Sequence, residues 1–401
     1  MATGKLYDKH PYETEFTAVV EQVKKGEDPG CWEVVLDQTL FFPEEGGQSP
    51  DQGEIVIHDI AYEVVYVSIS DEVITHTIRG KNEPMPGQKV LGRIDWGHRF
   101  SNMQNHTGEH IFSGIVHRAK GYDNVGFHLS DRMVTMDYNG VLTRGEIEEF
   151  TRQANRIIAE DLPVICEYPS EEALEAMEYR SKKEIEGAVR IVTIPGVDVC
   201  ACCAPHVRST AQVGLLMVVG DQRYKGGTRL SILCGLRAVA DYQKKQGILS
   251  LTGRNLSTNW ENIPETVDKL RSERDNLRYQ LSSLSAELLE ISARKLPEGE
   301  NACLFTDCSD RNVLIRTLNG MKQEHPGIAV IFAAKDGVTE KEKVSFSYVA
   351  ASLTGDSRRF SEQLKEKFGA RGGGKPEMVQ GSVAAKQEEL AEYVQKFVIN
   401  E

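Results

Sequence analysis

The stretch RFSNMQNHTGEHIFSGI, residues 99–115, contains two histidines four positions apart, His106 and His110. It lies within a longer segment, 96–121, whose pattern predicts a helix that ends at Gly121. Residues at positions i and i+4 of a helix lie on the same face, so both imidazoles can reach a single metal ion. The stretch therefore predicts one half of a metal site built on a helix.

A second motif, CACCAPH at residues 200–206, follows a predicted strand and offers the remaining ligands. Cys202 and His206 are separated by three residues, and Cys203 and His206 by two, and both spacings are sterically compatible with a shared metal. With the helical pair, either choice makes a donor set of three nitrogens and one sulfur, which suits tetrahedral Zn²⁺. Spacing alone does not choose between the two cysteines.

The helical motif has a competing interpretation. H-x-x-E-H is the signature of inverted zinc metalloproteases, in which Glu109 would be the general base. Such an enzyme needs a third, carboxylate ligand from a later helix, for which the candidates are Glu148, Glu149 and Glu160. This interpretation leaves the cysteine motif without a role.

Hydrophobic patterning predicts an α+β multidomain chain. Residues 1–90 contain short segments in which apolar and polar residues alternate, and Gly, Pro and Asp residues separate these segments. The pattern is typical of a small β-barrel. Residues 91–255 mix helices and strands and carry the metal motifs, with Thr143 and Glu146 forming a capping-box pattern. Residues 256–298 are expected to form a helical stalk or coiled coil, and residues 299–401 an α/β domain.

The stalk prediction depends on a heptad pattern over residues 262–295. Its a and d positions are apolar except for one arginine, and they are Val267, Leu270, Arg274, Leu277, Leu281, Leu284, Leu288 and Ile291. Beyond the stalk, FGARGGGKPEM at residues 368–378 is expected to be a conspicuous glycine-rich loop.

Composition sets limits on location and partners. The 401 residues carry a net charge of −13, which argues against nucleic-acid binding over the whole surface but permits local basic patches. No apolar run approaches a membrane span, and the N-terminus lacks a signal-peptide layout, so a cytoplasmic protein is expected. The eight cysteines are then expected to be reduced.

HTGEH and CCAPH taken together resemble the editing half of alanyl-tRNA synthetase and its free-standing relatives, the AlaX trans-editing proteins. The family's Gly-Gly-Gln loop and the aspartate and glycine after it are matched in FFPEEGGQSPDQG, residues 41–53. The segment ARGGGKPEMVQGSV, residues 370–383, resembles the glycine-rich signature of the DHH-associated domain. With no aminoacylation domain expected before the barrel, the chain resembles the long form of AlaX over nearly all of its length.

The resemblance implies a deacylase of mischarged tRNA(Ala), acting on seryl or glycyl esters, with one Zn²⁺ per chain. It favours Cys202 over Cys203 as the fourth ligand beside His106, His110 and His206. The stalk heptads are compatible with a homodimer formed through the stalk or the C-terminal domain, and the alternative is packing of two stalk helices within one chain. The expected catalytic residues are Gln48, Thr135 and Asp137, and the expected substrate-binding residues are Gly46, Gly47, Arg371, Gly373 and Lys375.

Two further expectations accompany the resemblance. Glu109 is expected to be a solvated carboxylate on the helix surface and not the catalytic base. The family's usual C-G-G-T-H is CCAPH here, so that Cys203, Ala204 and Pro205 make the loop stiffer and remove a hydroxyl. The competing functions are a tRNA-binding module with a structural zinc and, with less support, the H-x-x-E-H peptidase.

Overall fold

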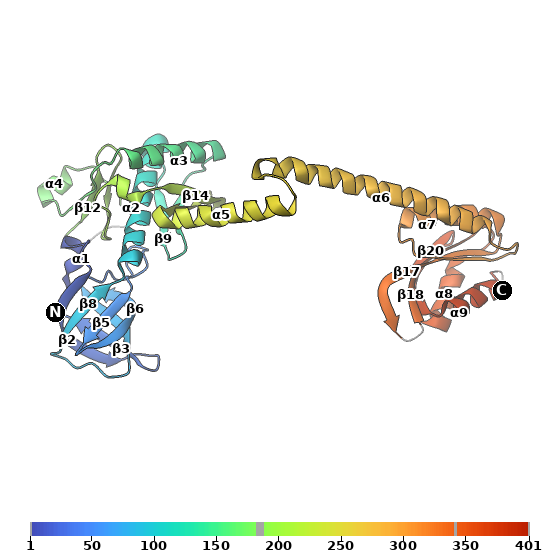
Figure 1. Ribbon diagram of the computed structural model, residues 1–401, viewed down its shortest axis with the longest axis horizontal. Coiled ribbons are helices and arrows are strands. Elements are labelled where there is room, and N and C mark those ends of the chain that lie inside the picture. The colour runs from blue at the N-terminus through green and yellow to red at the C-terminus, as the bar shows by residue number, and fades with distance from the viewer. Residues whose placement is uncertain (1, 182–187, 341–342, 400–401) are drawn as a thin grey trace. The chain divides into compact units, whose positions relative to one another are not determined.

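The computed structural model describes residues 2–181, 188–340 and 343–399. Contacts divide the chain into two units, one ending at Leu249 and the other beginning at Ser250, and each is described by itself (Figure 1). Within the described residues no helix is both long and apolar enough to cross a membrane.

The first unit begins with a closed six-stranded barrel, as the sequence predicts. Side chains alternate between core and solvent along its strands, as in β2, so each strand contributes one apolar face to the interior. The strands, in order around the barrel, are β2 (Glu15–Lys25), β3 (Cys31–Leu36), β7 (Val73–Arg79), β6 (Ile60–Ser70), β5 (Gly53–Ile57) and β8 (Lys89–Ile94). Beside it, β1 (Gly4–Lys5) pairs with β4 (Gln38–Thr39), and α1 (Leu6–Lys9) follows β1.

One polar side chain in this barrel gives a pH-dependent prediction. His76 is fully buried, its Nε2 lies 2.9 Å from the hydroxyl of Thr39, and burial lowers its pKa to about 4. The unfolded chain therefore binds this proton below pH 6.5 and the folded chain only below about pH 4. We expect His76 to remove about 3 kcal/mol of stability between pH 7 and pH 4. Urea unfolding of the wild type and of His76→Leu across this pH range measures the difference, and parallel pH profiles would contradict it.

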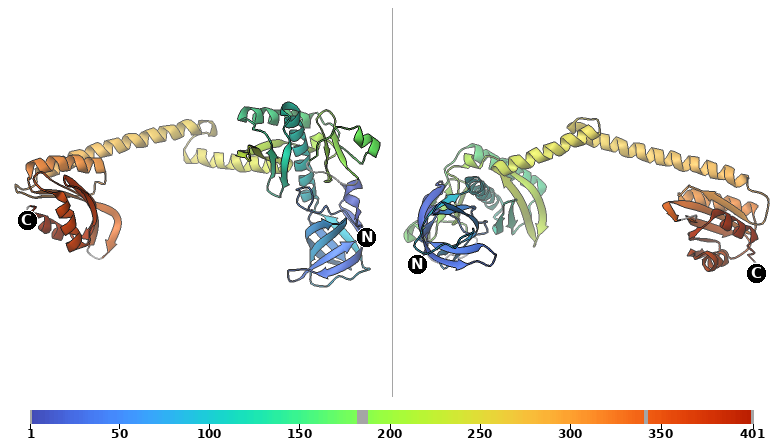
Figure 2. Two further views of the ribbon diagram at one scale, coloured as in Figure 1. Left: turned by 180° about the vertical axis from the view of Figure 1, so that it is seen from behind. Right: turned by 60° about the horizontal axis from the view of Figure 1, so that its bottom comes forward.

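The rest of the first unit surrounds one long central helix, α2 (Trp96–Lys120) (Figure 2). Asp95 caps its start by accepting a hydrogen bond from the backbone of His98, and it ends at Gly121 in the left-handed conformation (φ 67°). Next in the chain is α3 (Arg144–Ala159), which begins with the predicted capping box of Thr143 and Glu146. The remaining helices are α4 (Glu171–Glu175), η1 (Thr210–Val213) and α5 (Gly235–Asn255).

Two sheets pack around α2. The larger has the order β14 (Leu216–Tyr224), β15 (Gly227–Cys234), β10 (Val134–Tyr138) and β9 (Asn124–Leu129), and the smaller has the order β11 (Ile165–Glu167), β12 (Ile191–Ile194) and β13 (Asp198–Ala201). Both α2 and α3 contribute apolar side chains to one core with the larger sheet. As a result, α2 is covered on nearly all sides between Arg99 and Val116.

A buried ion pair joins the barrel to α2. Arg99 on α2 and Asp51, in the loop after the Gly-Gly-Gln motif, are both fully buried, and the guanidinium contacts both carboxylate oxygens. Arg99 also donates to the carbonyl of Pro11 at 3.1 Å, and Asp51 accepts from the backbone N–H of Phe42 at 2.6 Å. The pair therefore holds the motif loop against the helix that carries His106 and His110.

The second unit contains a long helix and a mixed sheet. The sheet order is β16 (Ala302–Thr306), β17 (Ile328–Glu340), β18 (Lys343–Ser352), β20 (Met378–Ala385) and β19 (Arg371–Lys375), with only the β16–β17 pair parallel. The helices are η2 (Trp260–Asn262), α6 (Ile263–Arg294), α7 (Arg311–Glu324), α8 (Ser357–Phe368) and α9 (Gln387–Lys396). This agrees with the expected α/β class, while the finer division into four domains stays a prediction.

The predicted stalk helix is confirmed as α6, but its apolar seam is not buried. Near its end α6 packs through Ala286 and Leu289, which lie in a core with β16 and α7. The heptad leucines remain largely exposed, with Leu277 at 64%, Leu281 at 66% and Leu288 at 66%.

The glycine-rich segment is a strand and not the expected loop. It forms β19, an edge strand whose residues pair with β20, with Gly372 opposite Gly381. A Cβ on Gly372 would lie 2.5 Å from both the Tyr348 hydroxyl and the Gln380 carbonyl, and one on Gly374 would lie 2.4 Å from the Met378 carbonyl. These two glycines are therefore required for close packing within the sheet.

Candidate metal centre

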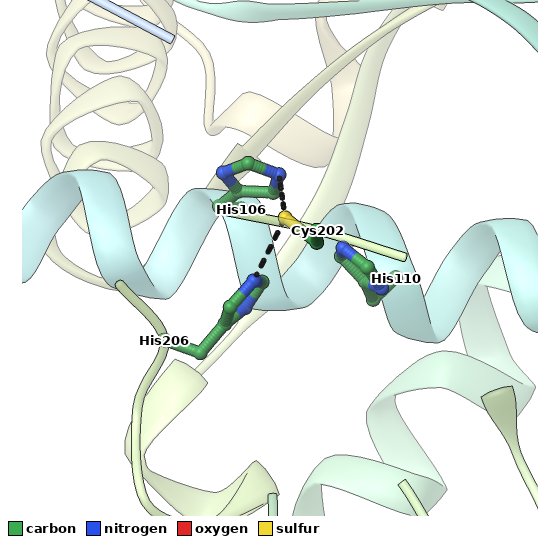
Figure 3. Close-up of side chains that lie close together, drawn as sticks. All are labelled: His106, His110, Cys202 and His206. Atoms are coloured by element: carbon green, nitrogen blue, oxygen red, sulfur yellow. Dashed lines mark hydrogen bonds between the residues drawn. The ribbon is translucent and has the colours of Figure 1, made fainter. Parts of the chain in front are cut away.

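The four predicted ligands converge from two elements of the first unit. His106 and His110 project from one face of α2, with ring centroids 5.4 Å apart, and Cys202 and His206 lie on the loop that follows β13 (Figure 3). Their ligand atoms all lie within 4.8 Å of one another, and all four side chains are buried or nearly so. Residues separated by about a hundred positions in the chain thus form one compact group.

The spacing of these atoms fits a tetrahedral ion. The sulfur of Cys202 lies 3.4 Å from His106 Nε2 and 3.3 Å from His206 Nε2. Around Zn²⁺, with bonds of roughly 2.3 Å to sulfur and 2.0–2.1 Å to nitrogen, the sulfur–nitrogen edge of a tetrahedron is about 3.6 Å. His110 Nε2 is buried and finds no hydrogen-bond partner in the part of the chain described, as expected of an atom directed at an ion.

The other ring nitrogen of each histidine is held by a buried side chain. His106 Nδ1 lies 2.7 Å from Gln48 Oε1, His110 Nδ1 lies 2.9 Å from Asp198 Oδ2, and His206 Nδ1 lies 3.0 Å from Thr107 Oγ1. When Nε2 binds a cation, Nδ1 carries the proton and donates it to these oxygens. Such outer contacts fix the tautomer and the ring orientation of metal-binding histidines.

Asp198 is itself fixed by Arg180, whose guanidinium donates to both carboxylate oxygens at 2.8 and 2.9 Å. Although burial would raise the pKa of Asp198, its bonds to His110 and Arg180 lower it, so the group is an anion. Asp198 also belongs to a second group of potential ligand atoms, with His110 and Cys200. Because its carboxylate already binds His110 and Arg180, we interpret it as an orienting group.

The protonation states of Cys202 and His206 favour a bound cation, whereas His110 carries a proton that a cation would have to displace. Burial alone would raise the pKa of the Cys202 thiol, but the nearby histidines outweigh it and hold the pKa well below its usual range. Burial lowers the pKa of His206 to about 3, so this ring is neutral. Burial would also lower the pKa of His110, but the bond to Asp198 raises it to about 9. A thiolate beside imidazoles is the donor set of a structural or catalytic zinc site.

Cys202, and not Cys203, belongs to this donor group. Both cysteines pack against the barrel core, but the sulfur of Cys203 is directed at the Gly-Gly-Gln loop, where a Cβ on Gly46 would lie 3.5 Å from it. Burial raises the pKa of Cys203 far above its usual value, so it remains a thiol.

The Gly-Gly-Gln loop is joined to the edge strand β9. Leu129 donates to the Gly47 carbonyl at 2.7 Å, and Ser49 donates to the Leu129 carbonyl at 3.0 Å. A Cβ on Gly47, which has φ 84°, would lie 2.4 Å from the Phe127 carbonyl, so only glycine fits. The loop thereby places Gln48 against His106, while Gln48 Nε2 is buried and has no hydrogen-bond partner among the described residues.

Thr135 and Asp137 are on β10 but are not brought to the metal group. Their neighbours Val134, Met136 and Tyr138 face the core that contains α2, and side chains alternate along a strand, so these two face the other side of the sheet. Asp137 forms an ion pair there with Arg229, at 2.6 Å. The contacts therefore give these two residues no place beside the metal ligands.

The expectation that Glu109 is a solvated carboxylate is wrong, while its expected absence from catalysis stays a prediction. Its side chain is completely buried and accepts hydrogen bonds from Ser113 at 2.6 Å and Asn124 at 2.7 Å. The reason is that α2 is a central helix, with no face free for a solvated carboxylate. The Oε1 atom of Glu109 is bound by Ser113 and Asn124, while its Oε2 lies 3.9 Å from His110 Nε2, so the buried carboxylate is next to the metal group.

The ligand set of an inverted metalloprotease is not formed either. Glu148 and Glu149 pair with the arginines of their own helix, at 3.1 and 2.7 Å. In the described ranges, no group of candidate ligand atoms includes these residues or Glu160.

The predicted substrate-binding residues of the second unit lie on β19. Arg371, Gly373 and Lys375 are all exposed on this edge strand. A Cβ on Gly373 would meet no atom of the described chain within 4 Å, so packing does not require a glycine at this position.

Sequence reasoning missed Asp198, Thr107 and Arg180. Asp198 lies four residues before Cys202 and Thr107 lies directly after His106, so proximity to a ligand was the only available signal. Their roles depend on contacts between distant segments, which no local pattern records.

A barrel attached to a helix-centred α+β domain, with a His-His-Cys-His group beside a Gly-Gly-Gln loop, defines the class of synthetase-like editing proteins. Two family profiles match: "tRNA synthetases class II (A)" at residues 5–98 and "Threonyl and Alanyl tRNA synthetase second additional domain" at residues 189–231. The alanyl-tRNA editing protein AlaX-L of Pyrococcus horikoshii is 30% identical over 96% of both chains. The chain therefore belongs to the AlaX-L family of alanyl-tRNA editing proteins.

Alanine–tRNA ligases are also similar to this chain. The enzyme of Pyrococcus abyssi is 30% identical over 99% of this chain, and that of Pyrococcus furiosus is 31% identical over 95%. The chain spans less than half of each, 44% and 42% of their lengths.

Proposed function

We propose that this protein is a trans-editing hydrolase that removes a wrong amino acid from mischarged tRNA(Ala) and thereby supports translation fidelity. The observation that carries the proposal is the buried group of His106, His110, Cys202 and His206, in which each histidine is oriented by a second side chain. Membership of the AlaX-L family supports the substrate class.

The reaction would be hydrolysis of an aminoacyl ester. Water adds to the ester carbonyl, the bond to the ribose oxygen breaks, and that oxygen leaves as a hydroxyl group. A Zn²⁺ ion held by the four ligands would supply Lewis-acid assistance to this addition or would order the site. Serine and glycine are the proposed substrates, because a pocket shaped by packing rejects an added hydroxyl or a missing methyl poorly.

Gln48 is the residue to which we assign contact with the reacting groups. Its Oε1 is occupied by His106 Nδ1, whereas its buried Nε2 has an N–H without an acceptor in the described chain. An unpaired buried donor costs about 1–3 kcal/mol, which a substrate carbonyl or the attacking water would recover on binding. Thr135 and Asp137 have no part in this proposal, because they face away from the ligands.

The second unit would bind the body of the tRNA. Arg371 and Lys375 are exposed cations at the two ends of β19, and Gly373 between them leaves the strand open to a phosphate backbone. The exposed heptad leucines of α6 support a homodimer through this helix, because a coiled-coil partner would bury that seam.

The test measures amino-acid release from Ser-, Gly- and Ala-tRNA(Ala). We expect the wild type to hydrolyse at least one mischarged ester well above the spontaneous rate and to spare Ala-tRNA(Ala). The assay contains excess zinc, so that loss of the Gln48 contact with His106 does not empty the site. Gln48→Ala should then lose about a hundredfold of that rate, and Gln22→Ala, at an exposed barrel glutamine, should lose none. Tight tRNA binding without any hydrolysis would instead establish the binding module with a structural zinc.

A further inference from the structure

A half-buried tyrosine, an exposed arginine and an exposed tyrosine lie near the loop that follows β13, the metal loop, and are not used by the proposed chemistry. We define the stacking patch as Tyr12 and Arg208, together with Tyr168, which lies four residues after Val164, whose backbone N–H donates to the Arg208 carbonyl at 2.9 Å. The guanidinium carbon of Arg208 lies 4.1 Å from the centroid of the Tyr12 ring, so the cation lies over the face of the ring. Arg208 is exposed, and within residues 2–181, 188–340 and 343–399 it forms no ion pair.

The Tyr12 side of the patch is rigid. The Tyr12 hydroxyl accepts from the backbone N–H of Arg208 at 2.8 Å and hydrogen-bonds Gln212, while the ring packs against Trp96 with centroids 5.4 Å apart. These contacts fix the backbone of Arg208 beside the Tyr12 ring, while the arginine itself is exposed to solvent. A guanidinium held in this way is ready to accept a second flat group.

Tyr168 is connected to the metal loop by a chain of polar contacts. Its hydroxyl donates to Asp8 at 3.0 Å, and Asp8 lies 3.9 Å from the guanidinium of Arg190. Arg190 in turn donates to the carbonyls of Cys202 and Ala204, at 3.0 and 2.9 Å. Tyr168 is thus held in place while 53% of the residue stays exposed.

The position of the patch limits what it would bind. Arg208 follows the ligand His206 by two residues, and two residues of extended chain span at most about 7 Å. The backbone of Arg208 is therefore within about 7 Å of a metal-ligand residue, near where the ester would bind. Unpaired nucleobases stack on tyrosine rings and guanidinium planes, and a cation also attracts the adjoining phosphates.

We propose that the stacking patch binds the unpaired nucleotides that precede the terminal adenosine of the substrate RNA. This proposal rests on the proposed function. It extends that function by assigning a binding position to the single-stranded 3′ end of the RNA. On a chain with a net charge of −13, Arg208 has no ion pair among the described residues and lies over the Tyr12 ring, which makes it a local site for an anionic, base-bearing strand.

The test compares two ester substrates that share the reacting group. One is 3′-O-seryl-adenosine, and the other is the same ester on the trinucleotide CCA. We expect the wild type to hydrolyse the trinucleotide ester with about tenfold higher kcat/KM, chiefly through KM. Arg208→Ala and Tyr168→Ala should lose most of this advantage and leave hydrolysis of seryl-adenosine unchanged. The matched controls, Arg223→Ala and Tyr242→Ala, alter exposed residues elsewhere and should keep the advantage.

Two results would overturn the proposal. One is an unchanged trinucleotide advantage in both variants, and the other is an equal loss on both esters, which would indicate a general structural effect. If the wild type hydrolyses neither ester, the proposed function fails while the patch is still tested by binding. In that case fluorescein-labelled CCA should bind the wild type about tenfold more tightly than Arg208→Ala, and equal affinities would reject the patch.

Discussion

Replacing Cys202 by alanine is expected to abolish metal retention and, with it, ester hydrolysis. The Cys202 sulfur is the only thiolate in the described donor group and lies within 3.4 Å of two histidine nitrogens. Loss of an outer contact usually weakens a metal site by 10–100-fold, so loss of a ligand should exceed about a hundredfold. Zinc per chain, measured by mass spectrometry after dialysis against a chelator, should fall from about one to near zero.

Cys203→Ala is the matched control. This neighbouring thiol is also half-buried, but it packs toward Gly46 and lies outside the donor group. We expect Cys203→Ala to keep its zinc and its fold. The opposite result, in which Cys203→Ala loses zinc and Cys202→Ala retains it, would show that the assignment of the fourth ligand is wrong.

Replacing Asp51 by alanine is expected to destabilise the first unit by about 3–5 kcal/mol, because it leaves the Arg99 guanidinium buried without its counter-ion. The same change frees the loop that places Gln48 against His106. Urea unfolding followed by circular dichroism measures the loss, and the rate of ester hydrolysis should fall together with stability.

Glu54→Ala provides the comparison for Asp51→Ala. Glu54 also pairs with an arginine, Arg93, but both side chains are 40–46% exposed, so this change should cost no more than about 1 kcal/mol. Equal losses of stability in the two variants would mean that the buried pair stabilises the fold no more than an exposed pair does.

Local sequence patterns determined much of the architecture. Alternating residues predicted the barrel, the capping box of Thr143 and Glu146 predicted the start of α3, and the heptads predicted α6. These features succeed because strand alternation, helix caps and heptads depend on neighbours a few residues apart. By the same logic, the i, i+4 spacing placed His106 and His110 on one face of α2.

Other predictions failed where burial from distant segments decided the outcome. Glu109 was expected on the surface because the sequence of a helix does not show which other segments pack against it. In the structure α2 is a central helix and Glu109 is buried. Thr135 and Asp137 lie on the predicted strand, but the face of the sheet that meets α2 is set by the whole core. The glycine run of β19 was expected to be a loop, whereas its missing side chains permit close pairing with β20.

The sequence by itself determined the fold class and the two pairs of metal ligands, since each pair is encoded within five residues. Spacing left Cys202 and Cys203 open and the family resemblance favoured Cys202, which the tertiary structure places in the donor group; only the tertiary structure showed that Gln48, Asp198 and Thr107 contact the histidines. Those three hydrogen bonds join residues 58, 88 and 99 positions apart. Contacts across such separations form only when the barrel, α2 and the loop after β13 pack together, so no local pattern can encode them.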